Sequence, residues 1–169
     1  MKEYLVLDNR FLIVDPELDI HLEGNLNELR RVFYPSGEIQ EETYYLEGKL
    51  HGPSTFFAEG KKILAKSFFY EGKRVGEYRQ YYFSGSLYSL QRFFQGRLHK
   101  KQEYFYEDGK IKSFMEYENG VLHGETQLFW PNGQCKRKMF FAFGNKEGLD
   151  RMWSEKGTKE GQIPVFCEQ

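Results

Sequence analysis

The chain has 169 residues, and its 24 Lys and Arg nearly balance 25 Asp and Glu, giving a net charge of −1. This length fits one domain with a core of its own, and the chain lacks the positive field that drives binding to nucleic acid, so nucleic acid is not expected as a partner. Aromatic residues make up 18% of the chain, beside 17 Gly and 5 Pro, a composition that favours strands and tight turns over helices.

The N-terminus and the cysteines indicate the compartment. The stretch MKEYLVLDNRFLIVD contains Lys2, Glu3 and Asp8 and so lacks the apolar core of a secretory signal. No apolar run approaches the roughly 18 to 20 residues of a membrane span. Cys135 and Cys167 form neither a CxxC motif nor a metal-ligand spacing, as is typical of reduced thiols. The sequence therefore predicts a soluble protein of the cytoplasm.

Residues 1–23 predict a β-hairpin. Two runs rich in aliphatic and aromatic residues, YLVLD and RFLIVD, flank Asp8 and Asn9, which are typical of a tight turn. We expect this hairpin to cap the N-terminal end of the repeats that follow.

From residue 24 onward the chain repeats with a period of 24 residues, marked by glycine at residues 24, 48, 72, 96, 120 and 144. A fixed period of this kind indicates a repeat architecture. We number the copies 1 to 6 (24–47, 48–71, 72–95, 96–119, 120–143 and 144–167) and the positions within each copy 1 to 24.

Three positions in each copy are mostly apolar. Position 10 is aromatic throughout: Phe33, Phe57, Tyr81, Phe105, Phe129 and Trp153. Position 16 is Ile39, Ile63, Leu87, Ile111 and Cys135, and position 22 is Tyr45, Phe69, Phe93, Tyr117 and Phe141. The runs around them are short, aromatic and bounded by glycine-containing turns, which predicts strands.

Turn signals place these strands in hairpins. A loop with glycine at position 14 in most copies sets position 10 opposite position 16. Between copies, pairs such as Glu47-Gly48 and Asn119-Gly120 indicate two-residue turns that set position 22 opposite position 3 of the next copy. The sequence therefore predicts an all-β fold, an elongated antiparallel array of about six β-hairpin repeats with terminal caps.

The spacing of the apolar positions predicts a β-bulge. Positions 16 and 22 are an even number of residues apart and share a face in a regular strand, whereas positions 3 and 10 do not. One extra residue at position 5, which is Gly52, Gly76, Gly124 or Gly148 in four copies, corrects this mismatch. We therefore expect positions 3, 10, 16 and 22 to form one continuous apolar face.

The sixth copy departs from the pattern. Lys159 replaces the aliphatic residue of position 16, and Pro164 falls in the last strand. Proline discourages further strand pairing, so residues 144–167 are predicted to close the array as a degenerate cap, within a repeat domain of residues 24–169.

The repeats resemble a known family. The pattern GxLHGExxxFWPNG is clearest in copy 5, where it comprises Gly120, Leu122, His123, Gly124, Glu125, Phe129, Trp130, Asn132 and Gly133. It is similar to the MORN-repeat variant family, which includes bacterial proteins labelled antitoxin-like, and the resemblance extends over residues 24–157. Copy 1 departs from it at Asn27-Glu28 and copy 4 at Lys100. The resemblance implies an elongated antiparallel sheet used for scaffolding, protein association or contact with membrane lipid.

No residues predict catalysis, a metal site or a cofactor. His51, His99 and His123 occupy one repeat position, and successive copies lie about 10 Å apart, too far to share one zinc ion, so a structural role is expected. Cys135 stands at an aliphatic position and is expected in the core. Paired carboxylates such as Glu41-Glu42 are interpreted as surface charge, and no phosphate-binding glycine motif is present.

Two surfaces are candidates for binding. Position 11 is aromatic in four copies, and this column is expected opposite the apolar face: Tyr34, Tyr82, Tyr106 and Trp130. Aromatic residues ringed by polar ones suit a protein partner, although they also suit packing along the sheet. A second candidate is a basic patch for anionic lipid: Lys100, Lys101, Lys136, Arg137 and Lys138.

The sequence therefore predicts a non-enzymatic protein-binding module or scaffold, with antitoxin-like neutralisation of a partner protein as one form of that role. A homodimer is one way to cover the exposed sheet. The alternative is a peripheral membrane scaffold that binds anionic lipid through the basic patch.

Overall fold

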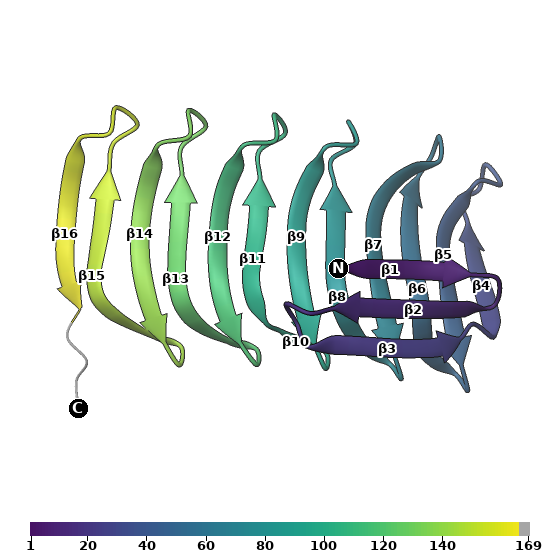
Figure 1. Ribbon diagram of the computed structural model, residues 1–169. Coiled ribbons are helices and arrows are strands. Elements are labelled where there is room, and N and C mark those ends of the chain that lie inside the picture. Colours follow the sequence, from purple (N-terminus) through teal and green to yellow (C-terminus); the bar gives the residue numbers. More distant parts are fainter. Residues whose placement is uncertain (166–169) are drawn as a thin grey trace.

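A computed structural model describes residues 1–165, so Cys167 lies outside the described residues. The fold is all-β and contains a 3-stranded and a 13-stranded antiparallel sheet (Figure 1). The small sheet comprises β1 (Glu3–Leu7), β2 (Arg10–Asp15) and β3 (Ile20–Asn25). The long sheet comprises β4 (Glu28–Phe33), β5 (Ile39–Leu46), β6 (Lys49–Ala58), β7 (Lys62–Tyr70), β8 (Lys73–Tyr81), β9 (Leu87–Phe94), β10 (Arg97–Leu98), β11 (Lys100–Phe105), β12 (Ile111–Glu118), β13 (Val121–Phe129), β14 (Cys135–Ala142), β15 (Asn145–Trp153) and β16 (Lys159–Val165).

The long sheet follows the order of the sequence from β4 to β16, and each neighbouring pair is antiparallel. Only the short β10 lies off this path, where it pairs with β9. The result is the predicted elongated array of hairpins (Figure 1).

The turns between copies have the predicted form. Both central residues have positive φ, for example 49° and 76° at Glu47 and Gly48 and 50° and 89° at Asn119 and Gly120, as a type I′ turn requires. The expected pairs across these turns, including Tyr45 with Leu50, are confirmed.

The loop within each copy also sets position 10 opposite position 16, as in the pair of Phe33 with Ile39. The next pair is Val32 with Glu41, so Gln40 is an extra residue in β5. The same shift follows position 16 in the other hairpins. A bulge therefore lies at position 17, where none was predicted.

The bulge predicted at position 5 is present but larger than expected. Tyr45 pairs with Leu50 and Thr43 with Ser54, so residues 51–53 lie opposite one residue of β5. Gly52 and Gly124 have φ of 108° and 109° within this bulge, a conformation that only glycine adopts readily.

The two bulges make the prediction of one apolar face wrong. Phe33 and Ile39 share a face, and the bulge at position 17 places Glu41, Thr43 and Tyr45 on the opposite one. Positions 3, 7, 9, 18, 20 and 22 form one face, which we call the open face. Positions 6, 8, 10, 16, 19, 21 and 23 form the other, which we call the covered face.

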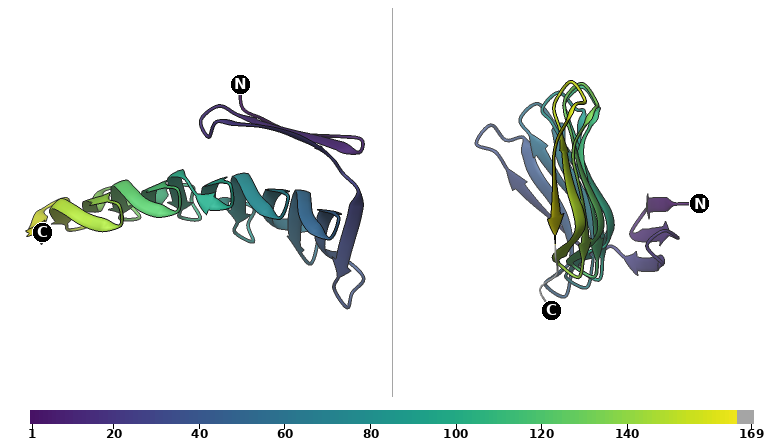
Figure 2. Two further views of the ribbon diagram at one scale, coloured as in Figure 1. Left: turned by 90° about the horizontal axis from the view of Figure 1, so that it is seen from below. Right: turned by 90° about the vertical axis from the view of Figure 1, so that its left-hand side faces the viewer.

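Residues 1–25 form a three-stranded sheet rather than a two-stranded hairpin, and they lie across the covered face of copies 1 to 3 instead of at the end of the array (Figures 1 and 2). The core sits at this contact. Its buried side chains are Phe11, Ile13, Leu18, Ile20, Leu26 and Val75, packed against Tyr4, Leu22, Tyr44, Phe68, Tyr70 and Phe94. Burial of this apolar surface explains the location of the small sheet.

The composition of the covered face changes where the small sheet ends. In copies 1 to 3, positions 21 and 23 supply Tyr44, Phe68, Tyr70 and Phe94 to the core. In copy 4 the same positions are Glu116 and Glu118. The charged residues of copy 4 suit a surface that the small sheet does not reach, whereas position 21 of copy 5 is again aromatic, the exposed Phe140.

A buried polar network anchors the small sheet. The Tyr4 hydroxyl donates to Asp15 Oδ2 at 2.6 Å and accepts from the Glu77 backbone N–H at 3.0 Å. Lys2 Nζ lies 2.8 Å from Glu77 Oε1 and 3.3 Å from Asp15 Oδ2. Burial, followed by the hydrogen bond to Asp15, raises the pKa of Tyr4 and keeps its proton in place. A Cβ at Gly76 would lie 2.5 Å from the Tyr4 ring, so the bulge glycine makes room for this contact.

Candidate functional site

The four aromatic residues of position 11 join neighbouring hairpins. Each is half-buried and donates a hydrogen bond to the backbone carbonyl of position 10 in the next copy. The pairs are Tyr34 Oη to Phe57 O (2.8 Å), Tyr82 Oη to Phe105 O (2.9 Å), Tyr106 Oη to Phe129 O (2.8 Å) and Trp130 Nε1 to Trp153 O (3.0 Å). These bonds give the residues a role within the array. Their contribution to partner binding stays a prediction.

Copy 2 lacks this aromatic residue and makes a different link. It has Ala58 at position 11, and its loop glycine, Gly60, lies at position 13 instead of position 14. Lys62 Nζ instead donates to the Phe83 carbonyl at 3.2 Å and lies 4.0 Å from the centre of the Phe83 ring. The loops of copies 2 and 3 are therefore joined by a hydrogen bond even though copy 2 lacks the aromatic residue at position 11.

Arg137, from the predicted basic patch, is committed to an ion pair on the open face. Its guanidinium donates two hydrogen bonds, of 2.8 and 2.6 Å, to the buried carboxylate of Asp150. Lys146 Nζ donates a third, of 2.8 Å. The Arg137 hydrogen bonds, against the opposing effect of burial and with a smaller contribution from the Lys146 bond, lower the pKa of Asp150 to about 2.

The other patch residues do not form a continuous cationic surface. Lys138 and Arg137 are adjacent on β14 and point to opposite faces. Lys138 pairs with Glu125 and Lys101 with Glu103. Lys136 Nζ lies 4.2 Å from the centre of the Trp130 ring. Lys100 is exposed and has a φ of 61° in the bulge of copy 4.

The histidines of position 4 fix the turn that ends their own copy. His51, His99 and His123 accept a backbone N–H through Nδ1, from Glu71 at 3.2 Å, Asn119 at 3.3 Å and Phe143 at 3.3 Å. This geometry supports the structural role predicted for them. Within residues 1–165, no three His, Cys, Asp or Glu side chains gather in a way that could hold a metal ion.

Acidification is expected to destabilise the protein through His51. Burial lowers the pKa of His51 below its ordinary value, against a smaller opposing effect of Glu71. An unfolded histidine titrates near pH 6.5, so the stability that neutral His51 contributes is complete above about pH 6.5 and is lost as the pH falls through its lower folded pKa. The loss is at most about 1.4 kcal/mol per pH unit. Thermal unfolding from pH 7 to pH 5 measures it.

The matched control is the exposed His21. We expect His51→Gln to flatten the dependence of Tm on pH, with a remainder from His99, whose pKa burial also lowers. His21→Gln should leave the slope unchanged. An unchanged slope in His51→Gln would contradict this assignment.

The open face carries aromatic residues in copies 1 to 5, and no described segment of residues 1–165 packs on it (Figure 2). Arg74 lies over three of its rings, 5.2 Å from the centre of Phe69, 4.4 Å from Tyr78 and 5.2 Å from Phe93. A shallow cleft of about 230 Å³ follows in copies 3 and 4, lined by Tyr88, Tyr104, Lys112, Ser113 and Met115. The sequence did not identify this face, because the bulge at position 17 was not foreseen.

Small polar residues occupy the middle of the open face. Thr43, Ser54, Ser67 and Ser89 are buried there, and the hydroxyls of Thr43 and Ser54 lie 2.9 Å apart in a hydrogen bond. The middle of the open face in copies 1 to 3 is therefore formed by small, buried polar residues.

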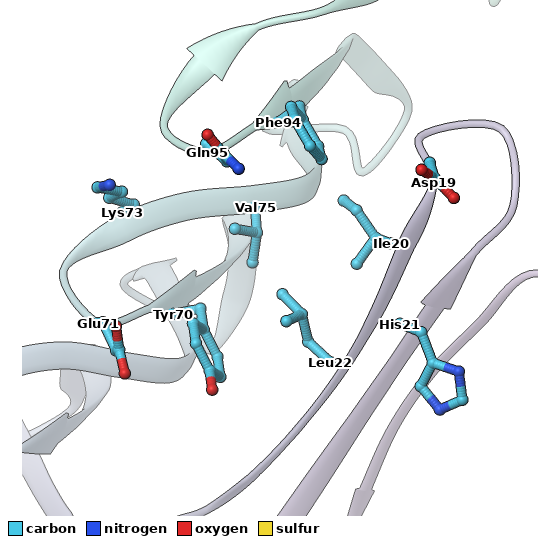
Figure 3. A pocket seen from close by; sticks show the side chains of 10 residues that line it. All are labelled: Asp19, Ile20, His21, Leu22, Tyr70, Glu71, Lys73, Val75, Phe94 and Gln95. Carbon is cyan, nitrogen blue, oxygen red and sulfur yellow. The ribbon is translucent and has the colours of Figure 1, made fainter.

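A second cleft, of about 350 Å³, lies between β3 and the turns that follow β7 and β9 (Figure 3). Ile20, Leu22, Val75 and Phe94 point toward its interior, whereas His21 points away. Its rim includes Asp19, Glu71, Lys73 and Gln95. The cleft is apolar inside and polar outside, and it contains no catalytic arrangement.

Comparison with known proteins identifies the repeats. No curated protein matches the chain. Within residues 1–165, the structure contains no helix with the length and hydropathy of a membrane span. The model of the MORN repeat variant matches residues 29–49, 74–95, 98–119 and 122–142. It skips copy 2, with its displaced glycine, and the degenerate copy 6. Since these matches cover just over half of the residues, the chain belongs to the MORN repeat variant family.

Proposed function

We propose that the chain is a non-enzymatic scaffold that binds another protein on its open face. One observation carries this proposal: no described segment of residues 1–165 packs on that face, whereas the small sheet already packs on the other face. MORN repeats are associated with binding and are not a class of enzymes, which supports the proposal.

The composition of the open face fits a protein interface. Position 22 is aromatic in five copies and pairs with position 3 of the next copy, which supplies Leu50, Leu98 and Leu122. Aromatic residues and arginine are enriched at the centres of protein interfaces, and extended apolar surface on a single molecule marks interaction sites. Arg74 with its three rings is the expected centre of the interface.

Phe56→Glu is expected to abolish most partner binding while the chain stays folded. Phe56 is 39% exposed and lies on the open face, where it pairs with Glu41 and Ala65. A buried, unpaired carboxylate in the interface should weaken binding by about tenfold or more. The measurement is affinity purification of the tagged chain from its native host, with quantitative identification of what co-purifies.

Phe140→Glu serves as the matched control. Phe140 is 47% exposed but lies on the other face of copy 5, where it pairs with Glu125 and Glu147. We expect this variant to retain its partners and both variants to stay folded with a similar, modest drop in Tm, because each places a carboxylate opposite a glutamate of a neighbouring strand. Equal loss of binding in both, or in neither, would rule out the open face.

Self-association is a specific form of this proposal. A second copy would cover the same columns, and sedimentation velocity distinguishes a homodimer from a monomer. Antitoxin-like neutralisation is another form: it requires one cognate protein to dominate the purified material, whereas a scaffold is expected to retain several proteins.

The lipid alternative has weaker support. Arg137, Lys138 and Lys101 are neutralised by neighbouring carboxylates, and Arg137 and Lys138 point to opposite faces. Binding to vesicles of anionic lipid that falls with added salt would favour the alternative.

A further inference from the structure

The strand β1 has an unpaired edge. Within residues 1–165 it pairs with β2 only, so alternate residues direct their backbone N–H and C=O groups away from the sheet. Leu5, Val6 and Leu7 form the exposed part of this edge, and the exposed fraction reaches 44% at Val6 and 67% at Leu7. An exposed apolar edge is a template for pairing with another strand.

The edges of the long sheet carry features that discourage such pairing. β4 presents the exposed charges of Glu28, Arg30 and Arg31. β16 contains Pro164, which has no N–H to donate. From Tyr4 to Leu7, β1 has neither charge nor proline. Its edge is therefore suited to strand addition.

A groove of about 340 Å³ lies between the β1 edge and the array. Tyr4 and Val6 line it on the β1 side, and Thr55, Lys66 and Arg79 line it from β6, β7 and β8. Tyr4 and Val6 pair with the buried Ile13 and Phe11 and therefore face the array. A strand added to β1 would direct alternate side chains into this groove.

The groove carries an excess of positive charge. Lys66 is exposed and forms no ion pair within the described part of the chain. Glu77 also lines the groove, but its carboxylate is paired with both Lys2 and Arg79. The groove is therefore complementary to acidic side chains.

We propose that the β1 edge binds an extended segment of a partner protein that alternates acidic and apolar residues. The backbone of the segment pairs with β1 and adds a strand to the small sheet. Its acidic side chains face Lys66 and Arg79, and its apolar side chains lie beside Leu5 and Leu7 on the outer side. This surface is separate from the open face, so the proposal does not depend on the function proposed above.

The probe is a displayed library of random ten-residue peptides, selected on the full chain. Enriched peptides are expected to alternate Asp or Glu with apolar residues. We expect Lys66→Glu to weaken their binding about tenfold or more in fluorescence polarisation, and added salt to weaken it as well. Lys156→Glu is the matched control, because Lys156 is an exposed lysine in the distant copy 6 loop, and it should bind as the wild type does.

Two further measurements test the strand pairing itself. Bound peptide should slow hydrogen exchange at backbone amides of β1, and Val6→Pro, which removes a donor from this strand, should abolish binding. If Val6→Pro does not fold, the binding of Lys66→Glu and the hydrogen exchange of β1 still test whether peptides bind at the β1 edge. The proposal is overturned if no peptide is enriched, if Lys66→Glu binds normally, if β1 exchange is unaffected, or if β1 is already protected by a second copy in a dimer.

Discussion

Phe11→Ala is expected to lower the free energy of unfolding by about 3 to 5 kcal/mol, as full truncation of a buried phenylalanine does in other cores. Phe11 is 2% exposed and lies where the small sheet meets the array. Its ring centre lies 5.2 Å from that of His51 and 6.5 Å from that of Tyr70. Alanine would leave a cavity in the core that the two sheets share. Urea unfolding followed by circular dichroism measures the loss.

Leu7→Ala is the control for this experiment. Leu7 belongs to the same small sheet but is largely exposed, so its truncation should change the free energy of unfolding by less than about 0.5 kcal/mol. If Phe11→Ala proved as mild as Leu7→Ala, the small sheet would not be packed on the array as the structure shows.

Gly124→Ala is expected to cost about 2 to 5 kcal/mol, the sum of backbone strain and overpacking. Gly124 has φ of 109°, and a Cβ there would lie 2.3 Å from Glu116 Oε2 and 2.9 Å from Glu116 Cβ. The Glu116 carboxylate would have to move, and it would lose the hydrogen bond of 2.7 Å that it accepts from the Glu125 N–H. Chemical denaturation of the purified variant measures the change.

Gly133→Ala separates the two parts of this cost. Gly133 has φ of 89° in a loop, and a Cβ there would meet nothing within 4 Å. We expect this variant to lose only the strain, about 1 to 2 kcal/mol. Equal losses in the two variants would show that contact with Glu116 adds nothing.

The hairpins could be predicted because their signals are local. Asn119-Gly120 and the loop glycines fix turns whose strands follow directly in the sequence, and pairs such as Tyr117 with Leu122 are confirmed. The bulge at position 17 could not be predicted in this way, because that position is Gln40, Leu64, Tyr88, Lys112 or Lys136 and has no characteristic residue. One unforeseen residue then reversed the face of every position beyond it.

The placement of the small sheet depends on contacts that are distant in sequence. The Glu77 N–H reaches Tyr4 across 73 residues, and no local pattern encodes such a pair. A partial signal existed in retrospect, since Phe68 and Tyr70 of copy 2 are replaced at the same positions of copy 4 by Glu116 and Glu118. In the candidate site, the aromatic column at position 11 was visible, but the carbonyls that accept its hydrogen bonds lie 23 residues away.

The long-range docking of residues 1–25 has a consequence for synthesis of the chain. Each hairpin of the array can form soon after its own residues leave the ribosome, because its contacts are local. Phe11, Ile13 and Ile20 are made first but share a core with Val75 and Phe94. At roughly 5 to 20 residues per second, their apolar side chains remain without those contacts for several seconds, the interval in which a nascent chain depends most on chaperones.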